Sequence, residues 1–204
     1  MKTVIAFILI SSAVFAQSGN DVLRKVQNKF KSIDDFTAGF VQSSGSVNES
    51  KSGGMSGKFF YKRKNKFVVE LNNQTIVCDG KVIWNYDGRF KRVVISNMAD
   101  DPTSFSLEKF IFDYPPHCNV SVVKDKPVNP GEQIIELIPK DNVMQFKLAY
   151  IWVSKHGLIS KMEIVDRGDI NYTFQFSDFK PDQHLPDSKF IYYPPKGIKV
   201  IDLR

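Results

Sequence analysis

Near the start of the chain, apolar residues recur at helical spacing. Between residues 20 and 33 they return every three or four positions, and residues three or four apart share one face of a helix. This stretch predicts one amphipathic helix, with Ser18 or Asn20 as its N-cap. Its apolar face consists of Val22, Leu23, Val26, Phe30 and Ile33.

From residue 36 the apolar residues alternate with polar ones, which is the period of a half-buried β-strand. Turn sequences at Asn72-Asn73, Asp79-Gly80 and Asp87-Gly88 separate these runs, and such tight turns join antiparallel neighbours. The pattern predicts an antiparallel meander of about eleven strands. They are 36–42, 58–63, 66–71, 75–78, 81–86, 90–96, 119–125, 132–139, 145–154, 158–166 and 170–179, with shorter runs at 190–193 and 199–203.

A sheet of this size is expected to curl, because flat sheets with so many strands are unusual and expose long edges. A second helix is predicted after Pro102, with Leu107, Phe110 and Ile111 on its apolar face. Only two or three helices are therefore available to cover the concave side of the sheet. Two arrangements stay open: a fully packed core, or an apolar cavity beneath a helical lid.

Residues 1–16 have the composition of a cleaved secretory signal. Lys2 precedes an apolar run from Val4 to Ile10, and small residues lead to Ala16, after which we expect cleavage. The run is too short to span a bilayer, and an uncleaved N-terminal anchor is the alternative. We expect an exported chain, residues 17–204, that forms one domain.

The chain carries a moderate positive charge, with 28 Lys and Arg against 22 Asp and Glu and a formal net charge of +6. This surplus is compatible with attraction to anionic lipid or to an acidic partner. It is weak evidence for nucleic acid, which an exported protein seldom meets, and we expect no nucleic-acid partner.

The two cysteines, Cys78 and Cys118, lie in separate segments and form no CxxC motif. Export permits a disulfide between them. The alternative is two buried thiols that pack as small apolar side chains, and the sequence leaves both states open.

No set of residues in the sequence indicates catalysis or metal binding. His117, His156 and His184 follow prolines or lie in turn-like sequences, and none has the HExxH spacing or another ligand spacing. GxSxG, Walker and GxGxxG motifs are also missing from the sequence. We therefore predict a protein that is not an enzyme and that holds no metal or cofactor.

Four aromatic residues and five positive charges lie between Gly57 and Leu71. Such a mixture can form a platform on which nucleic-acid bases stack. Strand alternation argues against this, because Phe59, Tyr61 and Arg63 share one face of the strand. If that face is concave, Arg63 needs acceptors, and the unpaired carbonyl groups at the ends of covering helices supply them. Arg63 would then hold a lid shut.

Several stretches support a more specific interpretation. They are "FTAGFVQ", "GKFFYKRKNKF", "VCDGKVIWNYD", "FQFSDFKPDQHLPDSKF" and "YYPPKGIKVID", preceded by an amphipathic helix. In this order and spacing they resemble the outer-membrane lipoprotein carrier protein (LolA) family, from about Asn20 to Arg204. The resemblance implies a mainly β fold: an unclosed antiparallel β-barrel with a helical lid over an apolar cavity.

The resemblance also implies roles for individual residues. In the family, an Arg in the strand that matches "FFYKR" bonds to the lid, which implies this role for Arg63, and the Phe four positions later, Phe67, helps to retain ligand. Lys64 stands where the family usually has Pro, and Val68 and Val69 stand where an aromatic is common. The predicted cavity residues are Phe40, Phe59, Tyr61, Phe67, Trp84, Phe146 and Leu148, and the predicted lid residues are Leu23, Val26, Phe30, Leu107, Phe110 and Ile111.

The function that the resemblance implies is a periplasmic carrier, expected to be a monomer. It would take acylated lipoproteins from the inner-membrane Lol ABC transporter and deliver them to an outer-membrane acceptor. The receptor of the LolB type is lipid-anchored, whereas no Cys lies near the expected cleavage point of this chain. Two other classes stay open: a lipid-binding sensor of the same fold that signals through a protein, and a secreted hydrolase.

Overall fold

The computed structural model describes residues 18–46, 54–99 and 106–204. The expected signal sequence and Pro102 lie outside these residues. No helix in the described part of the chain is long and apolar enough to cross a membrane.

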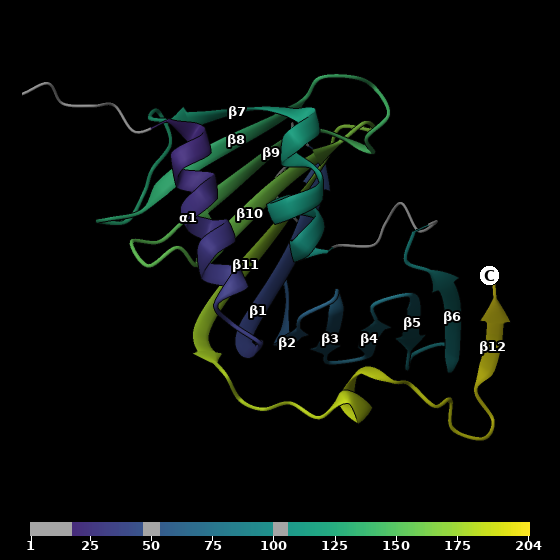
Figure 1. Cartoon of the computed structure of the whole chain (residues 1–204). Coiled ribbons are helices and arrows are strands. Elements are labelled where there is room, and N and C mark those ends of the chain that lie inside the picture. The colour runs from purple at the N-terminus through teal and green to yellow at the C-terminus, as the bar shows by residue number, and fades with distance from the viewer. Residues whose placement is uncertain (1–17, 47–53, 100–105) are drawn as a thin grey trace, which may run out of the picture.

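Within the described residues, twelve strands form one continuous sheet, in the order β12-β6-β5-β4-β3-β2-β1-β11-β10-β9-β8-β7 (Figure 1). All neighbours are antiparallel except β12 and β6, which run parallel. Their bounds are β1 Asp35–Ser46, β2 Met55–Lys62, β3 Lys66–Leu71, β4 Gln74–Asp79, β5 Val82–Asp87, β6 Arg92–Asn97, β7 Cys118–Val123, β8 Gln133–Pro139, β9 Phe146–Val153, β10 Ile159–Asp166, β11 Ile170–Pro181 and β12 Lys199–Asp202.

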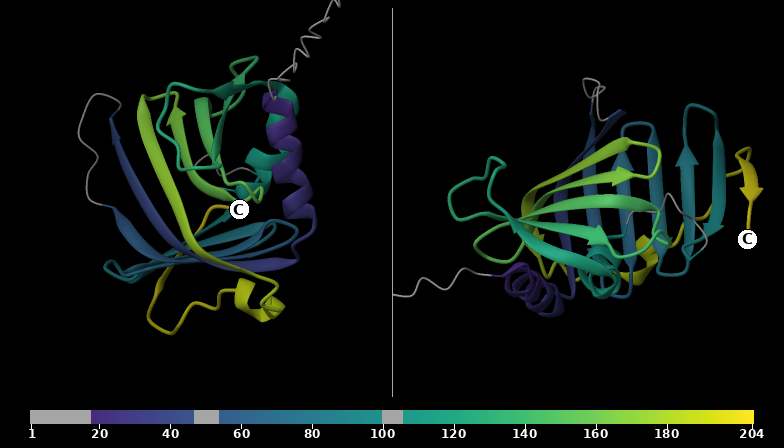
Figure 2. Two further views of the ribbon diagram at one scale, coloured as in Figure 1. Left: turned by 90° about the vertical axis from the view of Figure 1, so that its left-hand side faces the viewer. Right: turned by 90° about the horizontal axis from the view of Figure 1, so that it is seen from above.

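The sheet curves strongly but does not close, since β7 and β12 stand at its two ends without pairing to each other (Figure 2). Strand twist accumulates over many strands and bends a sheet of this size. The predicted unclosed antiparallel barrel is confirmed, with twelve strands rather than about eleven. Its concave side needs a separate cover.

Helix α1 (Gly19–Lys31) begins where the sequence predicts it. Ser18 is the N-cap: its side chain accepts a hydrogen bond from the Asp21 backbone, and the Asp21 side chain accepts one from the Ser18 backbone. This reciprocal pair satisfies two amide groups that a helix start leaves unpaired. Gly19 is required here, because an added Cβ would lie 2.7 Å from the Val120 carbonyl oxygen of β7.

A second covering segment, residues 106–113, begins with a short helical turn and continues as the π-helix η1 (Lys109–Asp113). The 3₁₀ turn η2 (Pro115–His117) leads from it into β7. Figure 2 (left) shows α1 and this segment on the same, concave side of the sheet. We call α1 and residues 106–113 the lid.

The prediction of a strand at 190–193 is wrong. That part of the chain crosses the convex side of the sheet and contains the 3₁₀ turn η3 (Asp187–Phe190), opposite α1 in Figure 2 (left). The buried Phe190 packs there against Val68 and Val77. This crossing carries the chain from β11 to the far edge of the sheet, where β12 pairs with β6. A crossover connection of this kind, unlike a hairpin, allows the two strands to run parallel.

Both cysteines are free and buried, so the open question of a disulfide is settled in favour of separate thiols. Cys78 Sγ lies 3.7 Å from Met98 Sδ, and Cys118 Sγ lies 3.9 Å from Met144 Sδ. Burial raises the pKa of the Cys78 thiol to about 12. At neutral pH this group therefore stays protonated and unreactive.

A thiol titration tests this state. In the native protein at neutral pH, we expect neither cysteine to react quickly with a thiol reagent, because both side chains are buried. Both thiols should react after unfolding without reductant. A protein that shows no thiol after such unfolding would contain the disulfide instead.

Candidate functional site

A cluster of aromatic rings covers the concave face where β1, β2, β3 and β11 lie side by side. Phe36, Phe40 and Phe59 are each at most 2% exposed. Phe40 stacks on Phe59 at 5.7 Å between ring centroids, and Phe59 stacks on Phe67 at 6.3 Å. Phe176 of β11 meets Phe59 edge to face. We call these five rings the aromatic wall.

The structure brings most of the predicted site residues together. The buried members from the sheet and those from both parts of the lid belong to one hydrophobic cluster, so that the lid packs directly on the aromatic wall. From the sheet these are Phe40, Phe59, Tyr61, Phe67 and Phe146, and from the lid Leu23, Val26, Phe30, Leu107, Phe110 and Ile111.

Two residues predicted to line the cavity lie elsewhere. Trp84 packs with the convex-side cluster around Phe190, because its neighbour Ile83 takes the concave face. Leu148 is only partly buried. A β-bulge shifts the register of β9 against β10 between Phe146 and Leu148, which inverts the alternation. Phe146 therefore faces the core, whereas Leu148 does not.

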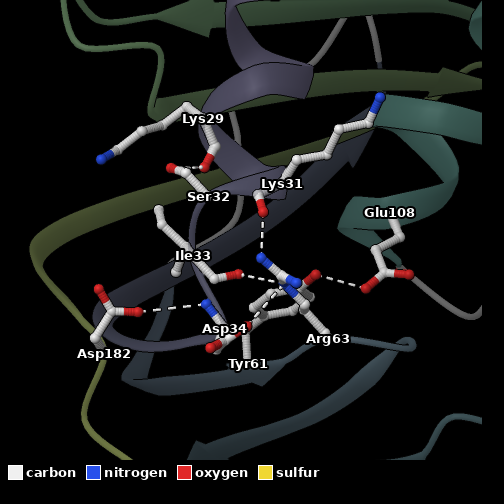
Figure 3. A network of polar contacts seen from close by, with 9 residues as sticks. All are labelled: Lys29, Lys31, Ser32, Ile33, Asp34, Tyr61, Arg63, Glu108 and Asp182. Atoms are coloured by element: carbon white, nitrogen blue, oxygen red, sulfur yellow. Dashed lines mark hydrogen bonds and ion pairs between the residues drawn. The ribbon is translucent and has the colours of Figure 1, made fainter.

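Arg63 follows the last residue of β2 and reaches back to the C-terminal end of α1 (Figure 3). Its Nη2 donates to the carbonyl oxygen of Lys31, and its Nε donates to that of Ile33 at 2.8 Å. An ion pair with Asp34 adds a contact at 3.2 Å. A cation is favourable at this position, because helix C-termini carry unpaired carbonyl groups and partial negative charge.

Tyr61, two residues before Arg63, holds the other part of the lid. Its hydroxyl donates to the Glu108 carboxyl group at the start of η1, and Figure 3 shows this bond beside the Arg63 contacts. Burial, followed by the hydrogen bond to Glu108, raises the pKa of Tyr61 well above its ordinary value. The end of β2 thus contacts both parts of the lid through two neighbouring side chains.

Further polar bonds join the lid segment to its surroundings. Gln27 Nε2 of α1 donates to the Ile111 carbonyl oxygen at 2.9 Å, and Ser106 Oγ donates to Asn65 Oδ1 at 2.7 Å. Lys109 Nζ donates to the Met98 carbonyl oxygen at 3.2 Å. Sequence reasoning missed Glu108 and Gln27; the one signal for Glu108 is an acidic residue within the apolar run "FSLEKFIF".

Aromatic side chains of the lid contact aromatic side chains of the sheet. Phe30 of α1 meets Phe36 and Tyr61 at ring-centroid distances of 6.0 Å, and Phe110 of the lid meets Phe146 at 5.2 Å. At these contacts the lid side chains occupy part of the concave face. An apolar ligand that bound at this part of the face would displace them.

Known proteins share this sequence pattern along most of the chain. The sequence profile of the family described as "Outer membrane lipoprotein carrier protein LolA" matches residues 31–193. The chain belongs to the LolA family. An outer-membrane lipoprotein carrier protein of Xanthomonas oryzae pv. oryzae is 25% identical over 210 residues, which cover 98% of this chain and 98% of that protein.

Two other similar proteins have no assigned role. An uncharacterized protein of Methanocaldococcus jannaschii is 23% identical over 97% of this chain, but the chain spans only 59% of that protein. The crystal structure of an uncharacterized conserved protein from Thermus thermophilus matches with a TM-score of 0.57 and 13% identity. The match covers 90% of this chain and 98% of that one, and it supports the fold alone.

The turn after Arg63 has a left-handed backbone. Lys64 and Asn65 turn the chain from β2 to β3 with φ angles of 70° and 58°. Proline holds φ near about −65° and cannot adopt this turn. Lys64 therefore takes a conformation that a proline at this position excludes. In this chain the left-handed turn at Lys64 and Asn65 begins directly after Arg63 and ends the strand there.

Lys64→Pro should therefore destabilise the fold by more than about 1 kcal/mol, measured by urea unfolding. Lys64→Gly is the matched control, since glycine accepts a positive φ without strain. We expect it to unfold within about 0.5 kcal/mol of the unchanged protein. Equal stability of the two variants would show that the turn does not require a left-handed residue.

Tyr61→Phe should release the lid segment while the aromatic packing stays. The lost hydrogen bond to Glu108 should cost about 1 kcal/mol in the free energy of unfolding, and amide hydrogen exchange should become faster in residues 106–114. Tyr193→Phe is the control, because Tyr193 is 78% exposed. Unchanged exchange in residues 106–114 would mean that Tyr61 does not hold the lid.

Proposed function

We propose that this protein is a periplasmic carrier that shields the acyl chains of lipoproteins between its aromatic wall and its lid. The observation that carries the proposal is the lid itself: two helical segments outside the sheet cover a large apolar face. Their apolar side chains pack on that face, and polar bonds join them to β2, to the loop after it and to each other. Membership of the LolA family supports the same role.

Burial of acyl chains makes this role energetically demanding. Each methylene that leaves water contributes about 0.8 kcal/mol, so roughly forty methylenes of a triacylated lipoprotein amount to about 30 kcal/mol. Non-covalent affinities saturate near about 20 kcal/mol. The carrier therefore cannot extract its cargo from a membrane unaided. A donor that uses energy is required, and we propose the inner-membrane Lol ABC transporter.

The lid bonds set how strongly the carrier retains its cargo. When the lid opens, Arg63 loses the carbonyl acceptors of Lys31 and Ile33, and Tyr61 loses Glu108. These bonds favour the closed, empty protein and so weaken ligand binding by the same amount. This cost of opening assists release to an outer-membrane acceptor. We propose that Arg63 acts as the latch and that Phe67 helps to retain the ligand.

The expected location follows from the same proposal. Residues 1–16 would direct export and be removed near Ala16, and residues 17–204 would form the carrier domain in the periplasm. The relative from Xanthomonas oryzae pv. oryzae is named an outer-membrane lipoprotein carrier protein, which supports this location and a non-enzymatic function.

A binding experiment tests the proposal. The purified protein is mixed with a triacylated lipopeptide, and the complex is isolated by size-exclusion chromatography and weighed by mass spectrometry. We expect stoichiometric binding with every acyl ester intact. Failure to bind the lipopeptide would contradict the carrier role, and cleaved acyl esters would indicate a hydrolase.

Arg63→Leu should retain lipoprotein but release it poorly. Without the Arg63 bonds, the free energy needed to open the lid is lower, so the ligand-bound protein is more stable relative to the empty one. In a transfer assay to acceptor-containing membranes, we expect delivery to fall at least about tenfold, equivalent to about 1.4 kcal/mol. Arg167→Leu is the matched control, since Arg167 Nε also donates to a backbone carbonyl, that of Met144 at 2.6 Å, away from the lid. Delivery by Arg63→Leu at the normal rate would refute the latch.

A further inference from the structure

An exposed aromatic ring stands at the tip of the β5–β6 hairpin among basic residues. Phe90 is 65% exposed, and the chain reads "DGRFKR" across the turn. The guanidinium groups of Arg89 and Arg92 lie 5.7 Å and 5.0 Å from the Phe90 ring centroid. The exposed ring and the two guanidinium groups beside it form one mixed aromatic and basic surface.

The C-terminal strand adds further basic residues to this tip. Lys199 pairs with Arg92 in the parallel ladder, and its backbone N–H donates to the Lys91 carbonyl oxygen at 2.9 Å. Figure 1 shows the start of β12 beside the β5–β6 hairpin. Lys196 is exposed three residues earlier. We call Arg89, Phe90, Lys91, Arg92, Lys196 and Lys199 the basic tip.

Negative charge at the basic tip is limited. Asp87 forms an ion pair with Arg89 at 3.2 Å, and the adjoining turn of β3–β4 is the uncharged pair Asn72-Asn73, whose Asn73 carbonyl oxygen accepts from Gly88 at 2.8 Å. Among the described residues of the basic tip and its turn, five basic side chains against the carboxylate of Asp87 leave a surplus of four positive charges. Beside the turn, Tyr192 stacks on Tyr86 at 5.8 Å.

We propose that the basic tip docks the protein on an anionic phospholipid surface. Basic side chains near a membrane are attracted to anionic headgroups, and exposed aromatic rings settle at the boundary between headgroups and acyl chains. A ring flanked by cations on a projecting hairpin combines both contacts. A protein partner would more often bind an exposed ring in an apolar pocket of its own. Such binding would not require a cluster of positive charges around the ring.

The basic tip lies away from the place where the lid attaches. β6 runs from Arg92 at the tip to Asn97, a distance of about 17 Å for an extended strand, and the next residue, Met98, accepts the bond from Lys109 of the lid. The protein could therefore rest on a membrane through the tip while the lid opens at the other end of β6. Docking does not depend on the acyl-binding role.

Vesicle flotation with ligand-free protein tests the proposal. The probes are vesicles of phosphatidylglycerol mixed with phosphatidylcholine, and vesicles of phosphatidylcholine alone. We expect binding to the anionic vesicles only, and weaker binding at high salt. Equal binding to both kinds of vesicle, or to neither, would overturn the proposal.

Variants locate the contact. Arg92→Glu combined with Lys199→Glu should lower the affinity for anionic vesicles at least about tenfold, and Phe90→Ser should lower it less. The matched control combines Val143→Ser, at a residue that is 81% exposed, with Lys155→Glu at another exposed position; it should bind normally. Equal loss in tip and control variants would overturn the proposal.

Two further outcomes separate the hypotheses. Tip variants that lose vesicle binding but still bind the triacylated lipopeptide would support a docking surface distinct from the acyl site. If the unchanged protein ignores anionic vesicles, and the tip variants instead lose transfer from membranes that contain the transporter, the tip serves an acidic protein partner and the proposal is wrong.

Discussion

A curved sheet that gathers large aromatic rings on its concave face cannot cover that face itself, and this constraint shapes the rest of the molecule. β7 and β12 do not pair with each other, so the sheet remains open. The cover must come from helical segments outside the sheet. These helical segments have no backbone ladder with the sheet, so side-chain contacts hold them in place. At the end of β2, Tyr61 and Arg63 supply hydrogen bonds to them.

The two parts of the lid are attached differently. Arg63 contacts the C-terminal end of α1, where the helix already continues into β1 through residues 32–34. Its bonds therefore fix the direction in which α1 leaves β1. Tyr61 holds the lid segment at Glu108, and Gln27 joins that segment to α1. The Gln27 bond therefore links the two parts of the lid directly.

Local pattern predicted much of this architecture. Helical spacing and the Ser18 cap located α1, and strict alternation placed Phe59, Tyr61 and Phe67 on the concave face. Alternation failed where the backbone departs from regular pairing: the bulge between Phe146 and Leu148 leaves no mark in the residue types. Trp84 is large and apolar, yet it faces the convex side, where it is partly buried against the C-terminal crossing with Phe190.

The partners of the lid were harder to predict than its apolar face. Which side chains of a helix or strand are buried follows from the spacing of its apolar residues, and the sequence displays this spacing. The hydrogen bond of Tyr61 to Glu108 joins residues 47 positions apart, and no local pattern indicates it. The carbonyl acceptors of Arg63 could be anticipated in kind, since helix ends always offer them. The residues that supply them, Lys31 and Ile33, required the fold.

Native mass spectrometry of the protein isolated from the periplasm of a Gram-negative host tests the central claim most directly. Apolar packing and a few polar bonds hold the lid closed, and the proposed carrier opens it for acyl chains. Acylated ligands should therefore be found on a fraction of the molecules, and that fraction should rise in Arg63→Leu. Bare protein in both preparations would mean that the aromatic wall is a permanently packed core and that the lid does not open for acyl chains.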